Sequence, residues 1–132
     1  MTPSHAIASI ALASVFWDGR LTMAGSRALR HALDYRKPFK DYDDDRMVHL
    51  MDDLLAELRE KGAQHMMVDA AQCLEQEHRS TAFAVAAEIM RSDGSYQQDE
   101  INILQNLANV LDLSTGYTGE VMRVMDALHA EL

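Results

Sequence analysis

The stretch that decides the fold is residues 82–113, which read AFAVAAEIMRSDGSYQQDEINILQNLANVLDL. Both halves are apolar at helical spacing, and the dipeptide Asp93-Gly94 separates them. Apolar residues at i, i+3, i+4 and i+7 form one face of a helix, and glycine readily takes the left-handed backbone that ends one. The stretch therefore predicts two helices joined by an Asp-Gly turn, with Glu100 in the first turn of the second helix.

Residues 7–33 show the same order of features near the N-terminus. An offset of 75 residues (93 minus 18) pairs Asp18-Gly19 with Asp93-Gly94, Ile10 with Val85, and Leu29 with Leu104. A two-helix unit cannot bury its apolar face alone, so two copies are expected to pack around one core. The sequence thus predicts an internal, pseudo-twofold repeat of a helix–Asp-Gly-turn–helix unit.

The remaining segments are also helical in period, and no stretch alternates with the period of two that marks a strand. The expected helices span about residues 4–17, 23–35, 43–61, 63–74, 77–91 and 97–111, with a last one from 114 to near the C-terminus. We expect a single all-α domain over residues 1–132, a compact bundle of about seven helices. In the last helix, the apolar residues expected to face inward are Val121, Val124, Met125 and Leu128.

The composition of the chain limits the classes of partner that it is expected to bind. The chain of 132 residues is 48% hydrophobic and carries a net charge of −9, which suits a globular protein and repels nucleic-acid phosphates and anionic membrane surfaces. Cations and basic protein surfaces are the natural electrostatic partners, although acidity also simply keeps a protein soluble. The acidic run at Asp41, Asp43, Asp44 and Asp45 is expected either to favour a helix start or to attract such a partner.

The N-terminal apolar segment and the sulfur residues are expected to be structural. Residues 1–16 lack the preceding Lys or Arg of a secretion signal, so we interpret them as a buried helix and expect a cytoplasmic protein. No run is long enough to span a membrane. The single cysteine, Cys73, is expected to be a buried thiol, and Met66-Met67 either fills the core or forms an adaptable patch for a partner.

The second Asp-Gly segment carries a family resemblance. It reads D-G-x-x-x-x-x-E from Asp93 to Glu100, follows an alanine-rich helix, and closes at Leu111-Asp112-Leu113-Ser114. This combination resembles the TerB family of tellurite-resistance proteins and is similar to the TerB-like domain of some DnaJ-type co-chaperones. The resemblance covers nearly the whole chain and is most specific over residues 54–114. It implies a compact all-α bundle that acts in stress or tellurite resistance through acidic, metal-binding surfaces, without enzymatic activity.

One departure from that pattern makes the two copies unequal. The family places a Glu after each Asp-Gly turn, but the first copy has Gly25 at this position, preceded by Ala24. A two-site metal scheme carried over from the family is therefore in doubt here. Within the first copy only Asp18 remains.

The predicted metal ligands are Asp18, Asp93 and Glu100, which would approach one another if the two copies pack together. Hard cations such as Ca²⁺ or another divalent ion are bound by carboxylate oxygens. The same residues are also explained without a metal, because Asp before Gly accepts turn amides and Glu in a first helical turn caps free N–H groups. The spacing does not match an EF-hand.

Catalytic motifs are not found in the sequence. There is no G-x-S-x-G elbow, no glycine-rich phosphate loop, and no pair of histidines at metal-binding spacing. The sequence therefore favours a non-enzymatic stress-resistance module whose acidic surface binds divalent cations or a protein partner. The alternative is a helical protein–protein interaction module of a chaperone or membrane-associated complex, in which a metal has no role.

Overall fold

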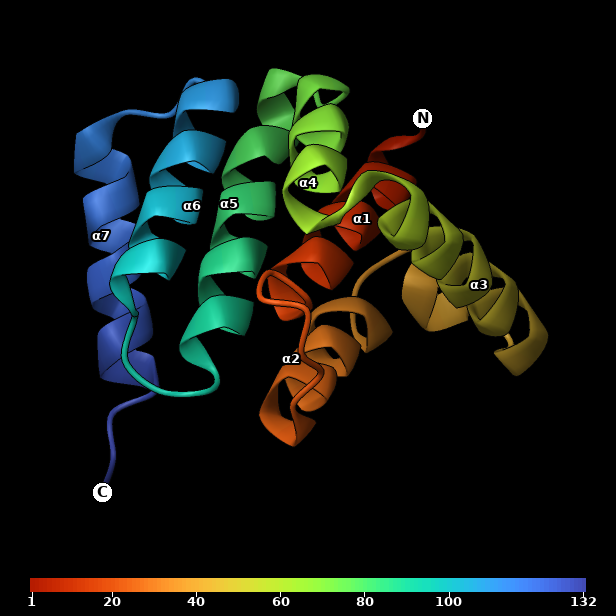
Figure 1. Ribbon diagram of the computed structural model, residues 1–132, viewed down its shortest axis with the longest axis horizontal. Coiled ribbons are helices and arrows are strands. Elements are labelled where there is room, and N and C mark those ends of the chain that lie inside the picture. The colour runs from red at the N-terminus through yellow and green to blue at the C-terminus, as the bar shows by residue number, and fades with distance from the viewer.

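The computed structural model describes residues 1–132 as an all-α protein without strands (Figure 1). The elements are α1 (Pro3–Val15), α2 (Met23–Asp34), a short 3-10 helix η1 (Phe39–Asp41), α3 (Asp44–Lys61), α4 (Ala63–Gln72), α5 (Gln76–Arg91), α6 (Gln98–Val110) and α7 (Thr115–Leu128). The predicted fold class and the number of helices are confirmed. The pseudo-twofold relation between the two helix pairs stays a prediction.

Local capping sets most of the helix boundaries. Thr22 caps α2 by accepting the N–H of Gly25 at 2.9 Å, and Asp43 caps α3 by accepting the N–H of Arg46 at 2.8 Å. Such side-chain oxygens satisfy N–H groups that lack a partner within the helix. Gly62, with a φ of 82°, ends α3 and begins α4 in the left-handed region that glycine tolerates best.

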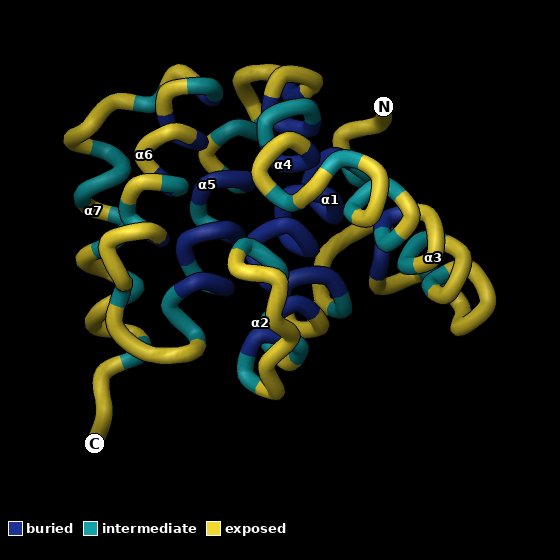
Figure 2. The backbone as a smooth tube through the Cα atoms, in the orientation of Figure 1, coloured by how far each residue is buried: buried dark blue, intermediate teal, exposed yellow.

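The core is built around α1. Every residue from Ala6 to Val15 is buried, and α1 packs against α4, α5, α2 and α3. Figure 2 shows this helix as the dark centre of the molecule, surrounded by helices with one exposed side. Small residues over most of its length let neighbouring helices approach from several directions. One apolar cluster extends from α1 toward α4–α7, and the other extends toward α2, η1 and α3.

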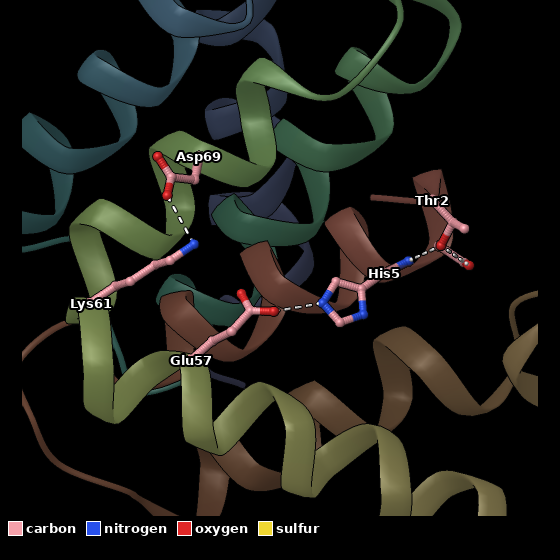
Figure 3. A network of polar contacts seen from close by, with 6 residues as sticks. Thr2, His5, Glu57, Lys61 and Asp69 are labelled. Carbon is pink, nitrogen blue, oxygen red and sulfur yellow. Dashed lines mark hydrogen bonds and ion pairs between the residues drawn. The ribbon is translucent and has the colours of Figure 1, made fainter.

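Helix α3 projects from the rest of the molecule (Figure 1). Only Leu54 of its residues is fully buried. Two ion pairs tie its C-terminal half to the body: His5 Nε2 to Glu57 Oε1 at 2.8 Å, and Lys61 Nζ to Asp69 Oδ2 at 3.1 Å (Figure 3). The acidic N-terminal part of α3 therefore extends outward.

Two sequence predictions about burial were wrong, and for Met66-Met67 the core alternative is confirmed. Cys73 is exposed, because it lies at the C-terminal cap of α4 rather than on its apolar face. Val124 and Leu128 are 59% and 63% exposed, because no element covers the side of α7 on which they lie. Met66 and Met67 are buried, so they belong to the core and do not form a surface patch.

The sequence also predicted that no segment is long enough to span a membrane. None of the helices combines the length and the apolar character that crossing a bilayer requires.

Candidate functional site

The two Asp-Gly turns lie close together in the fold. Gly19 and Gly94 have positive φ values of 78° and 138°, which suits glycine at each turn. Asp18 Oδ1 accepts the N–H of Arg20 at 3.0 Å, so part of its role is to close the first turn. This is the turn-closing interpretation that the sequence allowed beside the metal interpretation.

Thr22 connects the two helix pairs directly. Its hydroxyl donates to Asp93 Oδ1 at 2.7 Å, across 71 residues of sequence. The same oxygen accepts the Gly25 N–H at the start of α2. One hydroxyl thus caps α2 and also holds the Asp93 carboxylate of the other turn.

Glu100 is a buried carboxylate in this region, with 5% of its surface exposed. Its Oε1 accepts the Gln97 N–H at 2.9 Å, the hydrogen bond expected of a capping Glu. Burial raises the pKa of Glu100 most strongly, the bond from Gln97 lowers it, and the negative charges of Asp93 and Asp18 raise it further. The three predicted residues therefore share one electrostatic environment.

Position 25, the equivalent of Glu100 in the first copy, has no room for a side chain. A Cβ on Gly25 would lie 3.0 Å from Thr22 Oγ1 and 3.3 Å from Val15 Cγ1. Contacts this close force a neighbour to move. A side chain at position 25 would therefore press on Thr22, the residue whose hydroxyl bridges the two turns.

The carboxylates do not form a ready coordination sphere. The structure contains no group of three or more His, Cys, Asp or Glu side chains arranged to hold one metal ion. Known ligand arrangements for Ca²⁺ use six or more oxygens at short distance. The metal role of Asp18, Asp93 and Glu100 stays a prediction. The observed contacts are turn closure for Asp18, a bond from Thr22 of the other turn for Asp93, and capping for Glu100.

A second feature is a groove on the surface of α5, with a volume of about 440 Å³. Its floor is one face of α5, because the lining residues of this helix recur at i, i+3, i+4 and i+7. They are Thr81, Ala84, Val85 and Glu88. One wall is formed by His31 and Ala32 of α2 and by Tyr35 and Arg36, which follow this helix, and Met125 of α7 contributes to the other side.

One exposed side chain lines this groove, and two others lie on α7 close in sequence to its lining residue Met125. Tyr35 is 79% exposed beside His31, with the two ring centroids 5.5 Å apart. On α7, Val124 and Leu128 fall on the same helical face as Met125 and are exposed. Unpartnered apolar residues gathered around a groove mark interaction sites. Val124 and Leu128 were predicted to face inward. They do lie on an apolar face of α7, but no other element covers this face.

No family model, curated protein or solved structure matches this chain. The resemblance to the TerB family therefore rests on the quoted residues alone and stays a prediction.

The groove was missed by reasoning from the sequence. Its floor residues on α5 look like an ordinary helical stripe, and the stripe's neighbours α2 and α7 come from distant parts of the chain. The only signal was the apolar series on α7, which is longer than one neighbouring helix can cover.

Proposed function

We propose that this protein is a non-enzymatic helical binding module, of the stress-resistance type that the sequence resemblance implies, and that it recognises a basic amphipathic helix of a protein partner. The observation that carries the proposal is the groove over α5, which is lined by the exposed Tyr35 after α2 and by Met125 of α7. Helix-in-groove recognition uses apolar anchors at i, i+3, i+4 and i+7 on the partner helix. The groove runs between helices, where such a segment can lie.

The net charge of the chain selects the sign of the partner, because the groove itself is lined by one acidic residue, Glu88, and one basic residue, Arg36. Glu88 lies in the groove floor and forms no ion pair within the chain. The net charge of −9 and the outward acidic start of α3 favour approach of a basic segment over an acidic one. A lysine or arginine of the docked helix would neutralise Glu88, while its apolar face covers Ala84, Val85 and Met125.

The test is a titration followed by amide chemical shifts. A synthetic leucine–lysine amphipathic helix of about four turns is added, and a leucine–glutamate peptide with the same apolar pattern serves as the control. We expect saturable shifts at Tyr35, Ala84 and Val124 with the basic peptide only. Shifts confined to the acidic start of α3, or equal binding of both peptides, would overturn the groove as the site.

Two variants sharpen this test. Glu88→Gln is expected to weaken binding of the basic peptide by roughly three- to tenfold, because it removes a partly desolvated charge contact. Glu120→Gln removes the same charge from an exposed position of α7 that does not line the groove, and its effect should be much smaller. Equal losses in the two variants would mean that net charge alone attracts the peptide.

A divalent cation remains the second candidate ligand, favoured by the shared environment of Glu100, Asp93 and Asp18. Burial is the main reason that the pKa of Glu100 is raised, and a cation there would offset the added effect of the Asp93 and Asp18 charges. Calcium titration with amide shifts tests it, and Glu120→Gln is again the control for Glu100→Gln. If the amides of Asp93 and Glu100 do not move at millimolar calcium, the cation role is excluded and the helix-binding proposal is unaffected.

A further inference from the structure

A second hollow, separate from the docking groove, lies where three helix ends meet. It has a volume of about 530 Å³, within the range of small-molecule sites. The end of α1 contributes Phe16 and Trp17, the end of α3 contributes Arg59 and Lys61, and the start of α4 contributes Gln64 and His65. It shares no lining residue with the groove over α5.

Its wall concentrates positive charge in an acidic protein. Lys61 and His65 both contact Asp69, at 3.1 and 3.4 Å, so one carboxylate holds both side chains at this wall (Figure 3 shows the pair of Lys61 and Asp69). Arg59 is exposed and forms no ion pair. Its guanidinium is therefore free to bind an anion, for which its geometry is well suited.

Trp17 gives the hollow an aromatic surface. It is the only tryptophan of the chain, it is half-buried, and it also lines an adjoining hollow of about 280 Å³. That second hollow is lined by polar groups of α6, Asp99, Asn102 and Asn106, together with Gln64. Amide and carboxylate groups beside an indole can hydrogen-bond to the edge of a ring stacked on it.

The start of α4 adds to the same wall. Gly62 is its N-cap and supplies no side-chain hydrogen bond, and the first turn holds no acidic residue. The N–H groups of this turn point along the helix toward its N-terminus, which favours an anion there. The partial positive charge at the start of α4 thus adds to the charges that Arg59 and Lys61 place at the same wall.

We propose that this hollow binds a small aromatic anion of the mononucleotide class. The ring stacks on the Trp17 indole with its polar edge toward Asn102 and Gln64. The phosphate lies at Arg59 and the start of α4. Binding uses stacking and charge-assisted hydrogen bonds and involves no bond-breaking step.

Intrinsic fluorescence tests the proposal directly, because Trp17 is the sole tryptophan. Titration with AMP is expected to change the Trp17 emission in a saturable way. Adenosine, which keeps the ring and lacks the phosphate, should bind at least roughly tenfold more weakly, and inorganic phosphate should compete with AMP. No saturable change up to millimolar AMP, or an equal response to adenosine, would overturn the site.

Variants separate a built site from surface charge. Arg59→Gln is expected to weaken AMP binding roughly tenfold, while Arg123→Gln, an exposed arginine of α7 outside both hollows, should leave it unchanged. Equal losses in the two variants would overturn the proposal. Trp17→Leu, followed by amide shifts, should weaken AMP binding, and unchanged affinity in this variant would exclude stacking on residue 17.

Discussion

The helix pairs α1–α2 and α5–α6 share an Asp-Gly turn and differ in how the following helix begins. In the second pair, the buried Glu100 accepts the N–H of Gln97, which lies in the same segment. In the first pair the equivalent position is Gly25, and Thr22 both caps α2 and donates to Asp93 of the other turn. Helix α6 is thus capped within its own segment, whereas the residue that caps α2 also bonds to the other turn.

The pairs also occupy different places in the fold. Helix α1 is buried along its length, and α2 packs on both α1 and α5. Helix α6 packs on α4 and α5, and α7 covers part of the second pair. Similar local sequence patterns can therefore contribute differently to the stability of the fold. The reason is that burial and the identity of one capping residue depend on what surrounds each helix pair.

The largest expected effect compares equivalent core positions of the two pairs. Ile10 is fully buried on α1, and its counterpart Val85 on α5 is 6% exposed. Ile10→Ala should lower the free energy of unfolding by about 2–5 kcal/mol, and Val85→Ala by about 1–3 kcal/mol. Urea unfolding of both variants measures this, and an equal or larger loss at Val85 would contradict the central place of α1.

The next change makes the first turn resemble the second. Gly25→Glu should destabilise the fold by about 1–3 kcal/mol, because its Cβ would crowd Thr22 Oγ1 and Val15 Cγ1. Gly116→Glu is the matched control, since a Cβ there meets no neighbouring atom and the position lies in the first turn of α7. Thermal unfolding should separate the two, and equal stability of Gly25→Glu and the wild type would refute the steric argument.

A smaller effect is expected from the contact between the turns. Thr22→Val removes both hydrogen bonds of the hydroxyl and should cost about 1–2 kcal/mol. Thr118→Val, whose hydroxyl bonds only within its own helix, is the control. A double-mutant cycle with Asp93→Asn isolates the bridging bond, and a coupling energy of zero would show that Thr22 acts only as a cap.

The smallest expected effect is a pH-dependent change in stability that arises at Glu100, in the second helix pair. The pKa of Glu100 is raised in the folded state. The contribution of Glu100 to the free energy of unfolding is therefore largest in acid, and it declines as the pH rises from the ordinary pKa of Glu through the raised value. Glu100→Gln keeps an oxygen for the Gln97 N–H and removes the charge. At pH 7 it should change stability by less than about 1 kcal/mol, in the stabilising direction.

The control for this prediction is the pH profile itself. The advantage of Glu100→Gln over the wild type should shrink as pH falls toward 4, where the wild-type carboxyl is protonated. Unfolding curves at several pH values measure it. A difference that grows in acid would mean that the charged form of Glu100 stabilises the fold.

Much of the helical organisation could be predicted from the sequence because it is local. Thr22, Asp43 and Ser114 each cap a helix at or next to its expected start, and Gly62 separates two of the helices. These features depend on side chains that reach backbone groups within a few residues. Predicted helix ends therefore agree with the structure within two residues or so, as capping arguments allow.

The candidate sites could be predicted only in part. Asp18, Asp93 and Glu100 were identified from the Asp-Gly turns, and the structure does bring them into one environment. It also gives them hydrogen-bond partners that the sequence could not specify, most clearly Thr22 for Asp93. A contact across 71 residues depends on how the helices pack, which local pattern does not encode.

Sequence alone determined that the chain folds as helices, where those helices begin and end, and which face of each is apolar, because period and capping are short-range properties. Tertiary structure alone decided which apolar faces are covered. It left Val124 and Leu128 exposed beside a groove, placed Cys73 at the surface, and assembled Trp17 and Arg59 into one hollow. The physical reason is that burial and proximity depend on the packing of distant segments, whose positions no single helix can specify.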